Sequence, residues 1–379
     1  MLACASAPNK STDQQINLFL KRLDIYIGRQ FLATFLFASL SFLALFIVID
    51  LIENVDRFIK NDIGPGVAAQ YYLSWLPEVF LLTAPVAVLL ASLYITGRLS
   101  SSNELPVIFS AGIGLKRLLL PFLTITLAIS ALNMVNAGWI VPHATIHKNW
   151  FGVHYLNKSY DSNFEKGNVH ILESDNRILS LARVDQNSGI AENVRIETFE
   201  GSRMVERIDA DSMRYSEHAG RWLLDNVRHR RFLPDTTLYT ENPGTDTLEL
   251  SITASSLKEY HLRPDEMNIV QHRRFIDEKQ QAGFSNLQVA IIQFHSKLAQ
   301  PVASLIMVLI GVPLSTRKKR SGLALEAGLS LLIGFVFLGF QKTILSVGEV
   351  EQLDPVLAAW LPNLLFLAVA ILLYKTAKT

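Results

Sequence analysis

Six long apolar stretches constrain this chain more than any other feature of its sequence. A helix needs about 20 consecutive apolar residues to cross the hydrocarbon core of a bilayer. The six segments that qualify are Phe31–Ile52, Leu76–Gly97, Leu118–Val141, Leu298–Thr316, Leu323–Val347 and Pro355–Tyr374. Half of the 379 residues are hydrophobic and only 18% are charged, which is too apolar for a soluble protein of this length. The sequence therefore predicts an α-helical membrane protein with three spans on either side of a polar block.

The basic residues of the short loops predict the orientation of these spans. Arg98, Lys116 and Arg117 lie between spans 2 and 3, and a run of four basic residues, 317–320, joins spans 4 and 5. The loops after spans 1 and 5 are acidic instead. We therefore expect both termini and both basic loops in the cytoplasm, with the block between spans 3 and 4 outside.

These boundaries divide the chain into five expected parts. They are a cytoplasmic tail (1–22), transmembrane helices 1–3 (23–142), an external β-rich domain (143–263), a helical connector (264–296) and transmembrane helices 4–6 (297–379). The connector is expected to begin a helix at Pro264, with Asp265 and Glu266 in its first turn. Capping-box spacing at Ser285–Gln288 predicts a second helix that runs without a break into span 4.

Short β-branched and aromatic runs, separated by turn residues, characterise the external block. They lie at 169–174, 177–184, 193–201, 221–232 and 248–252. A packed β-sandwich and an open β-fold whose apolar interior holds an acyl chain both fit this pattern.

The sequence contains no motif for a motor or a catalytic centre. It has no G-x-x-x-x-G-K-[ST] segment that would bind nucleotide phosphates, and no H-E-x-x-H or G-x-S-x-G motif. The single cysteine, Cys4, excludes a paired-cysteine site. His143, His147 and His154 follow span 3 at an uneven spacing that is more typical of interfacial polar residues than of metal ligands. If nucleotide hydrolysis drives transport, another subunit must supply it.

The loop "RLSSSNELPVIFSAGIGLKR", residues 98–117, predicts a short amphipathic helix at about 103–112. Ser102 or Asn103 caps it, and Ala111 with Gly112 ends it. The carboxylate of Glu104 either stabilises the helix dipole or helps this helix to dock on a partner subunit. The residues predicted to couple this chain to such a partner, here called the coupling residues, are Glu104, Leu105, Val107, Ile108 and Phe109.

Charged residues near the outer ends of the spans are candidates for substrate binding. Glu53, Asp56, Arg57 and Lys60 follow span 1 at spacings of three and four, which puts them on one side of a continuing helix. They are either interfacial anchors or a polar cavity rim where cations meet a phosphorylated headgroup. The candidate substrate-binding set is Asp56, Arg57, Lys60, Lys148 and Lys297. A solvated strand end or a phosphate contact fits three further arginines, Arg228, Arg230 and Arg231.

The order of these motifs resembles the LptF/LptG family of permeases of the lipopolysaccharide exporter. "LDIYIGRQFLATF" (Leu23–Phe35) is similar to the family's opening signature, and "NELPVIFSAGI" (Asn103–Ile113) to its cytoplasmic coupling segment. "KLAQPVASLIMVLIGVPLS" (Lys297–Ser315) is similar to its fourth span. The opening favours LptG, whereas the closing "VPLS" is closer to LptF.

The resemblance implies a transport subunit rather than an enzyme, in the inner membrane of a Gram-negative bacterium. Such a subunit pairs with a homologous six-span permease on an LptB-like ATPase dimer. Its jellyroll-like periplasmic domain passes lipopolysaccharide to an LptC-like protein and a periplasmic bridge. Glu104 would then face the ATPase, and Asp56, Arg57, Lys60 and Lys297 would lie near the cavity mouth. The resemblance implies no cofactor and no nucleic acid, since ATP binds to the partner subunit.

The sequence departs from the family at Glu53, because LptG proteins often have a lysine there. Two other function classes fit part of the pattern. A lipoprotein-releasing or MacB-type permease shares the external domain and the partner ATPase, but it usually has four spans with the large domain after the first. A membrane lipid-modifying enzyme needs polar groups that converge within the spans, where spans 3 and 6 offer only Asn133, Asn136 and Asn363.

Overall fold

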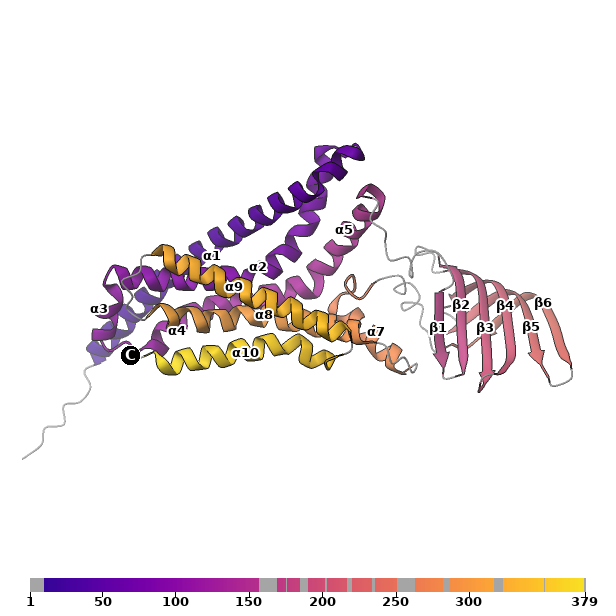
Figure 1. Ribbon diagram of the computed structural model, residues 1–379. Coiled ribbons are helices and arrows are strands. Elements are labelled where there is room, and N and C mark those ends of the chain that lie inside the picture. The colour runs from indigo at the N-terminus through magenta and orange to yellow at the C-terminus, as the bar shows by residue number, and fades with distance from the viewer. Residues whose placement is uncertain are drawn as a thin grey trace, which may run out of the picture. The chain divides into compact units, whose positions relative to one another are not determined.

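The chain forms two compact units, one helical and one built around a β-sheet (Figure 1). The first comprises Met1–Lys148 and Ile292–Thr379, and the second comprises Asn149–Ile291. The computed structural model describes residues 10–156, 169–174, 176–184, 190–201, 203–216, 220–233, 236–250, 263–281, 287–316, 323–350 and 352–377.

Six of the described helices are long and apolar enough to cross a membrane, which confirms the predicted six-span fold. Five spans are formed by single helices, α1 (Lys10–Lys60), α2 (Pro65–Ser101), α8 (Gln288–Ser315), α9 (Leu323–Glu349) and α10 (Pro355–Thr376), and the third span starts with α4 (Leu115–Val135). The third span continues from α4 through a π-helical turn, η1 (Asn136–Ile140), into α5 (Val141–Leu156). The chain is therefore still helical beyond residue 142, where the sequence pattern starts the β-rich domain.

The short helix α3 (Glu104–Ser110) connects α2 to α4. Figure 1 shows α3 and the C-terminal end of α10 at the same end of the helical unit. This common end is the one that the loop charges assign to the cytoplasm.

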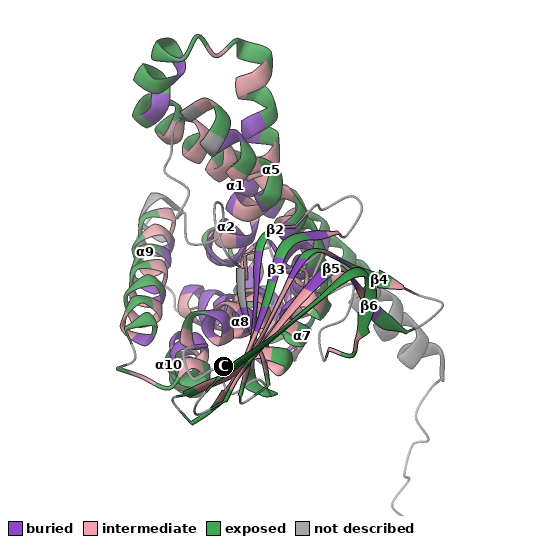
Figure 2. Cartoon of the chain, turned by 90° about the vertical axis from the view of Figure 1, so that its right-hand side faces the viewer, coloured by how far each residue is buried: buried purple, intermediate pink, exposed green. Residues whose placement is uncertain are grey.

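The second span, α2, is the central helix of the membrane unit. In its most apolar stretch 78% of the residues are buried, compared with 17% in α1 and 22% in α9. Figure 2 shows α9 exposed along one side. The flanking helices α1 and α9 therefore offer much of their apolar surface to lipid or to another membrane protein.

Polar side chains inside the spans bond to the backbone of neighbouring helices. Ser130 Oγ donates to the carbonyl oxygen of Pro301 at 2.7 Å, and Ser315 Oγ donates to that of Leu93 at 3.2 Å. The first bond joins α4 to α8 and the second joins α8 to α2. In the apolar core such bonds satisfy hydroxyl groups that water cannot reach, and they fix how the helices pack.

Small residues let α8 approach α2 closely. A Cβ atom added at Gly311 would lie 1.9 Å from Ser92 Oγ and 3.3 Å from Leu89 Cδ1. Glycine is therefore required at this crossing, as is common where membrane helices pack backbone to backbone.

The second unit contains one antiparallel sheet whose six strands follow one another in chain order. The strands are β1 (Val169–Ser174), β2 (Arg177–Val184), β3 (Ala191–Glu200), β4 (Arg203–Ser216), β5 (Arg221–Phe232) and β6 (Thr237–Leu248). The described strands form a single sheet rather than two packed sheets, which favours the open β-fold over the sandwich. β6 is exposed along almost its whole length (Figure 2).

The sheet has one apolar face and one charged face. Leu181, Val194 and Ala210 lie opposite one another on β2, β3 and β4, and all three are buried. On the other face Arg195 lies opposite Asp209, with 3.5 Å between their charged groups. Strand alternation therefore separates a hydrophobic surface from a ladder of opposite charges.

The connector helix α7 (Ile269–Gln281) begins later than the sequence predicts. Pro264 lies in a turn, because the reciprocal cap that starts the helix is at Asn268 and Gln271. Asn268 Oδ1 accepts from the Gln271 backbone N–H at 2.9 Å, and Gln271 Oε1 accepts from that of Asn268 at 2.9 Å. The predicted first turn at Pro264 is therefore wrong, whereas α8 does run unbroken into span 4. Ser285 lies outside the described residues.

Replacing Gly311 with valine is expected to separate α8 from α2, because the new side chain overlaps atoms of Ser92. Overpacking of this kind costs about 1–3 kcal/mol, which should lower the thermal midpoint of the purified protein in detergent. The control is Gly339→Val in α9, where an added Cβ has no atom within 4 Å. Equal midpoints for the two variants would contradict the close packing of α2 and α8.

Candidate functional site

Local backbone chemistry defines both ends of α3. Asn103 precedes the helix with φ +59°, a left-handed conformation that asparagine tolerates better than most residues. Gly112 follows it with φ +82°. The Gly112 N–H donates to the Phe109 carbonyl at 3.0 Å, and the Ile113 N–H donates to the Ile108 carbonyl at 3.3 Å. These two bonds form a Schellman cap, which ends the helix after two turns as the sequence predicts.

One face of α3 packs inward and the other is exposed. Leu105 is 2% exposed and Ile108 is 8% exposed, and Phe109 packs partly buried against the transmembrane core. Val107 is 68% exposed, next to exposed Pro106. Among the five predicted coupling residues, the inward-facing apolar ones therefore anchor the helix, and Val107 is the apolar one available to a partner.

Glu104 connects α3 to the start of the first span. Its Oε2 accepts a hydrogen bond from the Tyr26 hydroxyl at 3.2 Å, and its Oε1 accepts one from Ser102 Oγ at 2.8 Å. Both carboxylate oxygens thus have a partner. The bond to Tyr26 joins α3 directly to α1.

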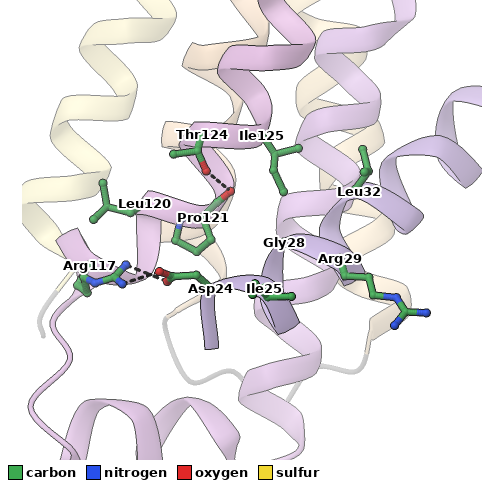
Figure 3. A pocket seen from close by; sticks show the side chains of 10 residues that line it. All are labelled: Asp24, Ile25, Gly28, Arg29, Leu32, Arg117, Leu120, Pro121, Thr124 and Ile125. Carbon is green, nitrogen blue, oxygen red and sulfur yellow. Dashed lines mark hydrogen bonds and ion pairs between the residues drawn. The ribbon is translucent and has the colours of Figure 1, made fainter. Parts of the chain in front are cut away.

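A second tether between α1 and the region of α3 lies just beyond the short helix. Arg117, at the start of α4, makes a bidentate ion pair with Asp24 of α1, with N–O distances of 2.9 and 2.6 Å (Figure 3). Bidentate arginine–carboxylate pairs fix orientation as well as distance. Together the two tethers couple the position of α3 to that of α1.

The charged residues predicted after span 1 lie on the last turns of α1. Asp56, Arg57 and Lys60 are exposed, as is Glu53. Arg57 donates to Oδ1 of buried Asn54 at 3.3 Å. These carboxylates and cations therefore share the exposed end of a continuous helix, as the spacing predicts.

Nearby packing holds this end of α1 against α2. Phe58 is buried between Tyr71 and Tyr72, with both ring centroids at 6.3 Å. Edge-to-face aromatic contacts of this kind fix the relative position of two helices.

Lys148 and Lys297, the other two candidate substrate residues, lie on different spans. Lys148 on α5 forms an ion pair with Glu78 of α2. Lys297 is partly buried on α8. Any role of the five candidates in binding substrate remains a prediction.

The arginines of β5 are divided between the two faces of the sheet. Arg228 pairs with Asp211 at 2.9 Å, and Arg230 lies over the ring of Tyr239 at 5.7 Å. Arg231 and His229 both contact Glu206, at 3.2 and 2.7 Å.

Two opposing effects act on the pKa of Glu206. Burial raises it, but the hydrogen bonds from His229 and Arg231 outweigh burial and hold it below its usual value. The three residues thus form a charged cluster at the border of the otherwise apolar face, next to Ile208.

Two of the three asparagines that an intramembrane enzyme would need bond to the backbone of a neighbouring helix, whereas the amide of buried Asn133 has no hydrogen-bond partner among the described residues. Asn136 Nδ2 donates to the Pro77 carbonyl at 2.9 Å, and Asn363 Nδ2 donates to the Ala299 carbonyl at 2.7 Å. Asn133 is fully buried. Within the described ranges, no group of three His, Cys, Asp or Glu residues could hold a metal ion.

Comparison with known proteins identifies the family. The family model for "Lipopolysaccharide export system permease LptF/LptG" matches residues 25–376. The chain belongs to the LptF/LptG family. A curated relative, the lipopolysaccharide export system permease protein LptG of Haemophilus influenzae (strain ATCC 51907 / DSM 11121 / KW20 / Rd), is 22% identical over 352 residues. That alignment covers 92% of this chain and 96% of the relative.

The family match extends over both the helical unit and the sheet unit. An LptF/LptG chain is a multi-pass inner-membrane permease, that is, a transport subunit rather than an enzyme. The match includes α3 with its tether to Tyr26, the charged end of α1 and the six-stranded sheet. Asp24, in the second tether, lies one residue before the matched range.

The tethers of this LptF/LptG chain were not apparent from its sequence. Tyr26 and Glu104 are 78 positions apart, and Asp24 and Arg117 are 93 apart. Opposite charges and a tyrosine near the starts of spans 1 and 3 are the only signal, and many sequences share it.

Truncating the inward face of α3 is expected to loosen this helix. Leu105→Ala or Ile108→Ala removes buried side chain, and such changes cost about 2–5 kcal/mol. Hydrogen exchange of the amides of residues 104–112 should therefore accelerate in the intact protein. Val107→Ala is the control, since its side chain is exposed. Faster exchange in the Val107 variant than in the Leu105 variant would contradict the assignment of Leu105 to the inward face and Val107 to the exposed face.

Proposed function

We propose that this chain is the transmembrane permease subunit of an ATP-driven exporter that extracts lipopolysaccharide from the inner membrane. The observation that carries the proposal is α3, a short helix with an exposed apolar face, tethered to α1, in a chain without a nucleotide-binding motif. Such a helix needs a partner that binds and hydrolyses ATP. An LptB-like ATPase dimer is that partner, and a homologous LptF or LptG permease completes the membrane part.

The distribution of charge supports the orientation that this function requires. Arg98 and Lys375, in the last turns of α2 and α10, lie at the α3 end together with Arg117. Positive charge marks cytoplasmic ends, so α3 is exposed to a cytoplasmic ATPase. The sheet unit, inserted between spans 3 and 4, is then periplasmic.

α1 is suited to transmit motion from the ATPase to the substrate. It is continuous from Lys10 to Lys60 and has no internal proline. Tyr26 and Arg57 are 31 residues apart on it, about 46 Å at 1.5 Å per residue. A displacement of α3 that moves Tyr26 would therefore move the charged outer end of the same rigid helix.

Lipopolysaccharide carries phosphates on an acylated sugar, which matches the two chemistries of the periplasmic side. Arg57, Lys60, Lys148 and Lys297 supply cations for the phosphates, and Asp56 supplies hydrogen-bond acceptors. The apolar interior of the sheet unit, where Trp222 and Leu224 are buried against each other in this state, is the proposed site for acyl chains. From there an LptC-like protein and a periplasmic bridge would receive the lipid.

Glu104→Gln and Tyr26→Phe separate coupling from simple positioning. The glutamine keeps an oxygen acceptor but removes the charge that would meet an arginine of the ATPase. The phenylalanine removes only the tether to α1. We expect Glu104→Gln to lower lipopolysaccharide-stimulated ATP hydrolysis of the purified complex about tenfold, the loss of one charge-assisted hydrogen bond. Tyr26→Phe should retain stimulated hydrolysis and lower lipid release for each ATP hydrolysed.

The complex itself is the control for this pair of variants. Both proteins must still copurify with an ATPase dimer and a second six-span chain in mild detergent, which native mass spectrometry measures. Full stimulation with Glu104→Gln would show that the carboxylate only orients α3. Isolation of wild-type protein as a lone monomer would overturn the proposed assembly.

Removing the cations at the end of α1 should weaken substrate binding. The double variant Arg57→Gln with Lys60→Gln is expected to retain about tenfold less lipopolysaccharide on purification, because charge-assisted contacts to phosphate are lost. Lipid mass spectrometry of the complex measures the retained lipid. Arg98→Gln with Lys375→Gln, which removes the same charge at the opposite end of the helices, is the control. Equal losses in both double variants would indicate a general charge effect.

A further inference from the structure

A groove between α1 and α4 is not explained by lipopolysaccharide export. Its volume is about 740 Å³, within the range of about 300–1,000 Å³ that is usual for small-molecule sites. Its apolar lining includes Ile25, Leu32 and Leu120, all of them exposed to the surroundings of the protein. The helices meet at Gly28, where an added Cβ would lie 2.9 Å from Ile125 Cδ1. The groove is therefore a cavity beside a tight crossing, open to whatever surrounds the span.

Both walls of the groove change from charged to apolar along the helix axis. On α1 the lining runs from Asp24 to Leu32, and on α4 it runs from Arg117 to Ile125. Each distance is eight residues, about 12 Å. Figure 3 shows the paired Asp24 and Arg117 toward one end, with Arg29 apart from them on the other side, and Leu32 and Ile125 toward the opposite end. The gradient follows the spans, as the headgroup and chain of a lipid do.

The charged end of the groove has a net positive charge. Asp24 neutralises Arg117 through their bidentate pair. Arg29 is exposed, and among the described residues it has no ion-pair partner. Figure 3 shows Arg29 and Arg117 on opposite sides of the groove. One uncompensated guanidinium group beside an apolar cavity favours an anion that carries an apolar chain.

We infer that this groove binds one anionic phospholipid of the cytoplasmic leaflet, with its phosphate at Arg29 and an acyl chain along Leu32 and Leu120. Basic pockets between transmembrane helices on the cytoplasmic side are known to take such headgroups. A membrane helix of another subunit would cover the apolar lining but would leave Arg29 to be paired separately. The inference uses the proposed orientation and is independent of transport.

The binding site has a structural consequence for the cytoplasmic end. Asp24 and Arg117 line its charged end, and the same pair fixes α1 beside α4 near α3. A lipid in the groove would shield this ion pair from water and so strengthen it. Anionic lipid would thereby hold the tethered arrangement of α1 and α3 together.

Lipid retention by the purified complex tests the site without ATP or lipopolysaccharide. The complex is stripped in detergent, incubated with phosphatidylglycerol or with phosphatidylcholine of the same acyl chains, and examined by native mass spectrometry. We expect one phosphatidylglycerol per chain and about tenfold weaker binding in Arg29→Gln, the loss of one charge-assisted contact. Leu120→Trp, which fills the groove, should also lose the lipid. Glycerol phosphate in excess should not displace it.

Matched variants and a crosslink keep the outcomes distinct. Arg98→Gln removes a cation from the same end of the helices outside the groove, and Leu132→Trp enlarges another exposed residue of α4. Both should bind lipid as the wild type does. Equal retention of the two phospholipids, or wild-type retention by Arg29→Gln and Leu120→Trp, overturns the inference. A photoreactive residue at position 120 that crosslinks to a protein rather than to a lipid overturns it too.

Discussion

The rest of the structure depends on the requirement that a bilayer imposes on the peptide backbone. Inside the hydrocarbon region every N–H and C=O must bond within the protein. The chain meets this requirement with six long helices, and some of the polar side chains in their interior, such as Ser130 and Asn363, bond to neighbouring backbones. The charged residues that are proposed to bind other molecules consequently lie at the two ends of the spans.

The α3 end and the charged outer end of the spans lie far apart, so the helix that connects them, α1, is important for function. At the α3 end, Tyr26 bonds to Glu104 and Asp24 pairs with Arg117. At the other end Arg57 and its charged neighbours lie on the same continuous α1. In the proposed exporter, one helix thus bears both the contact to the coupling helix and the cations for the substrate. The lipid-binding groove lies along this helix, beside the tether that joins it to α4.

Much of this arrangement could be predicted from sequence, because the signals are local. The length of the apolar stretches predicted the spans, and Gly112 predicted the end of α3. The strand β4 was missed because Arg207 and Asp209 interrupt its apolar alternation. In the sheet these residues lie on the charged face, where a cross-strand partner compensates each of them. The predicted helix start at Pro264 failed because a reciprocal cap further along the chain, at Asn268, is stronger.

The sequence could not show which side of α3 faces inward, since Leu105, Val107 and Ile108 are equally apolar. That choice depends on packing against residues far away in the chain. Tethers between residues about 80 to 90 positions apart have no local signature either. Long-range contacts of this kind, rather than propensity, decide which part of the predicted coupling segment is presented to a partner.

Lipopolysaccharide release from proteoliposomes tests the central claim most directly. The chain would be reconstituted with its six-span partner and the ATPase, and transfer of labelled lipopolysaccharide to a soluble periplasmic acceptor would be followed after ATP is added. We predict transfer that requires ATP, the ATPase and this chain together, and that falls when Glu104 is replaced with glutamine. ATP-dependent transfer of equal rate without this chain, or a chemically altered lipid as the product, would contradict the account.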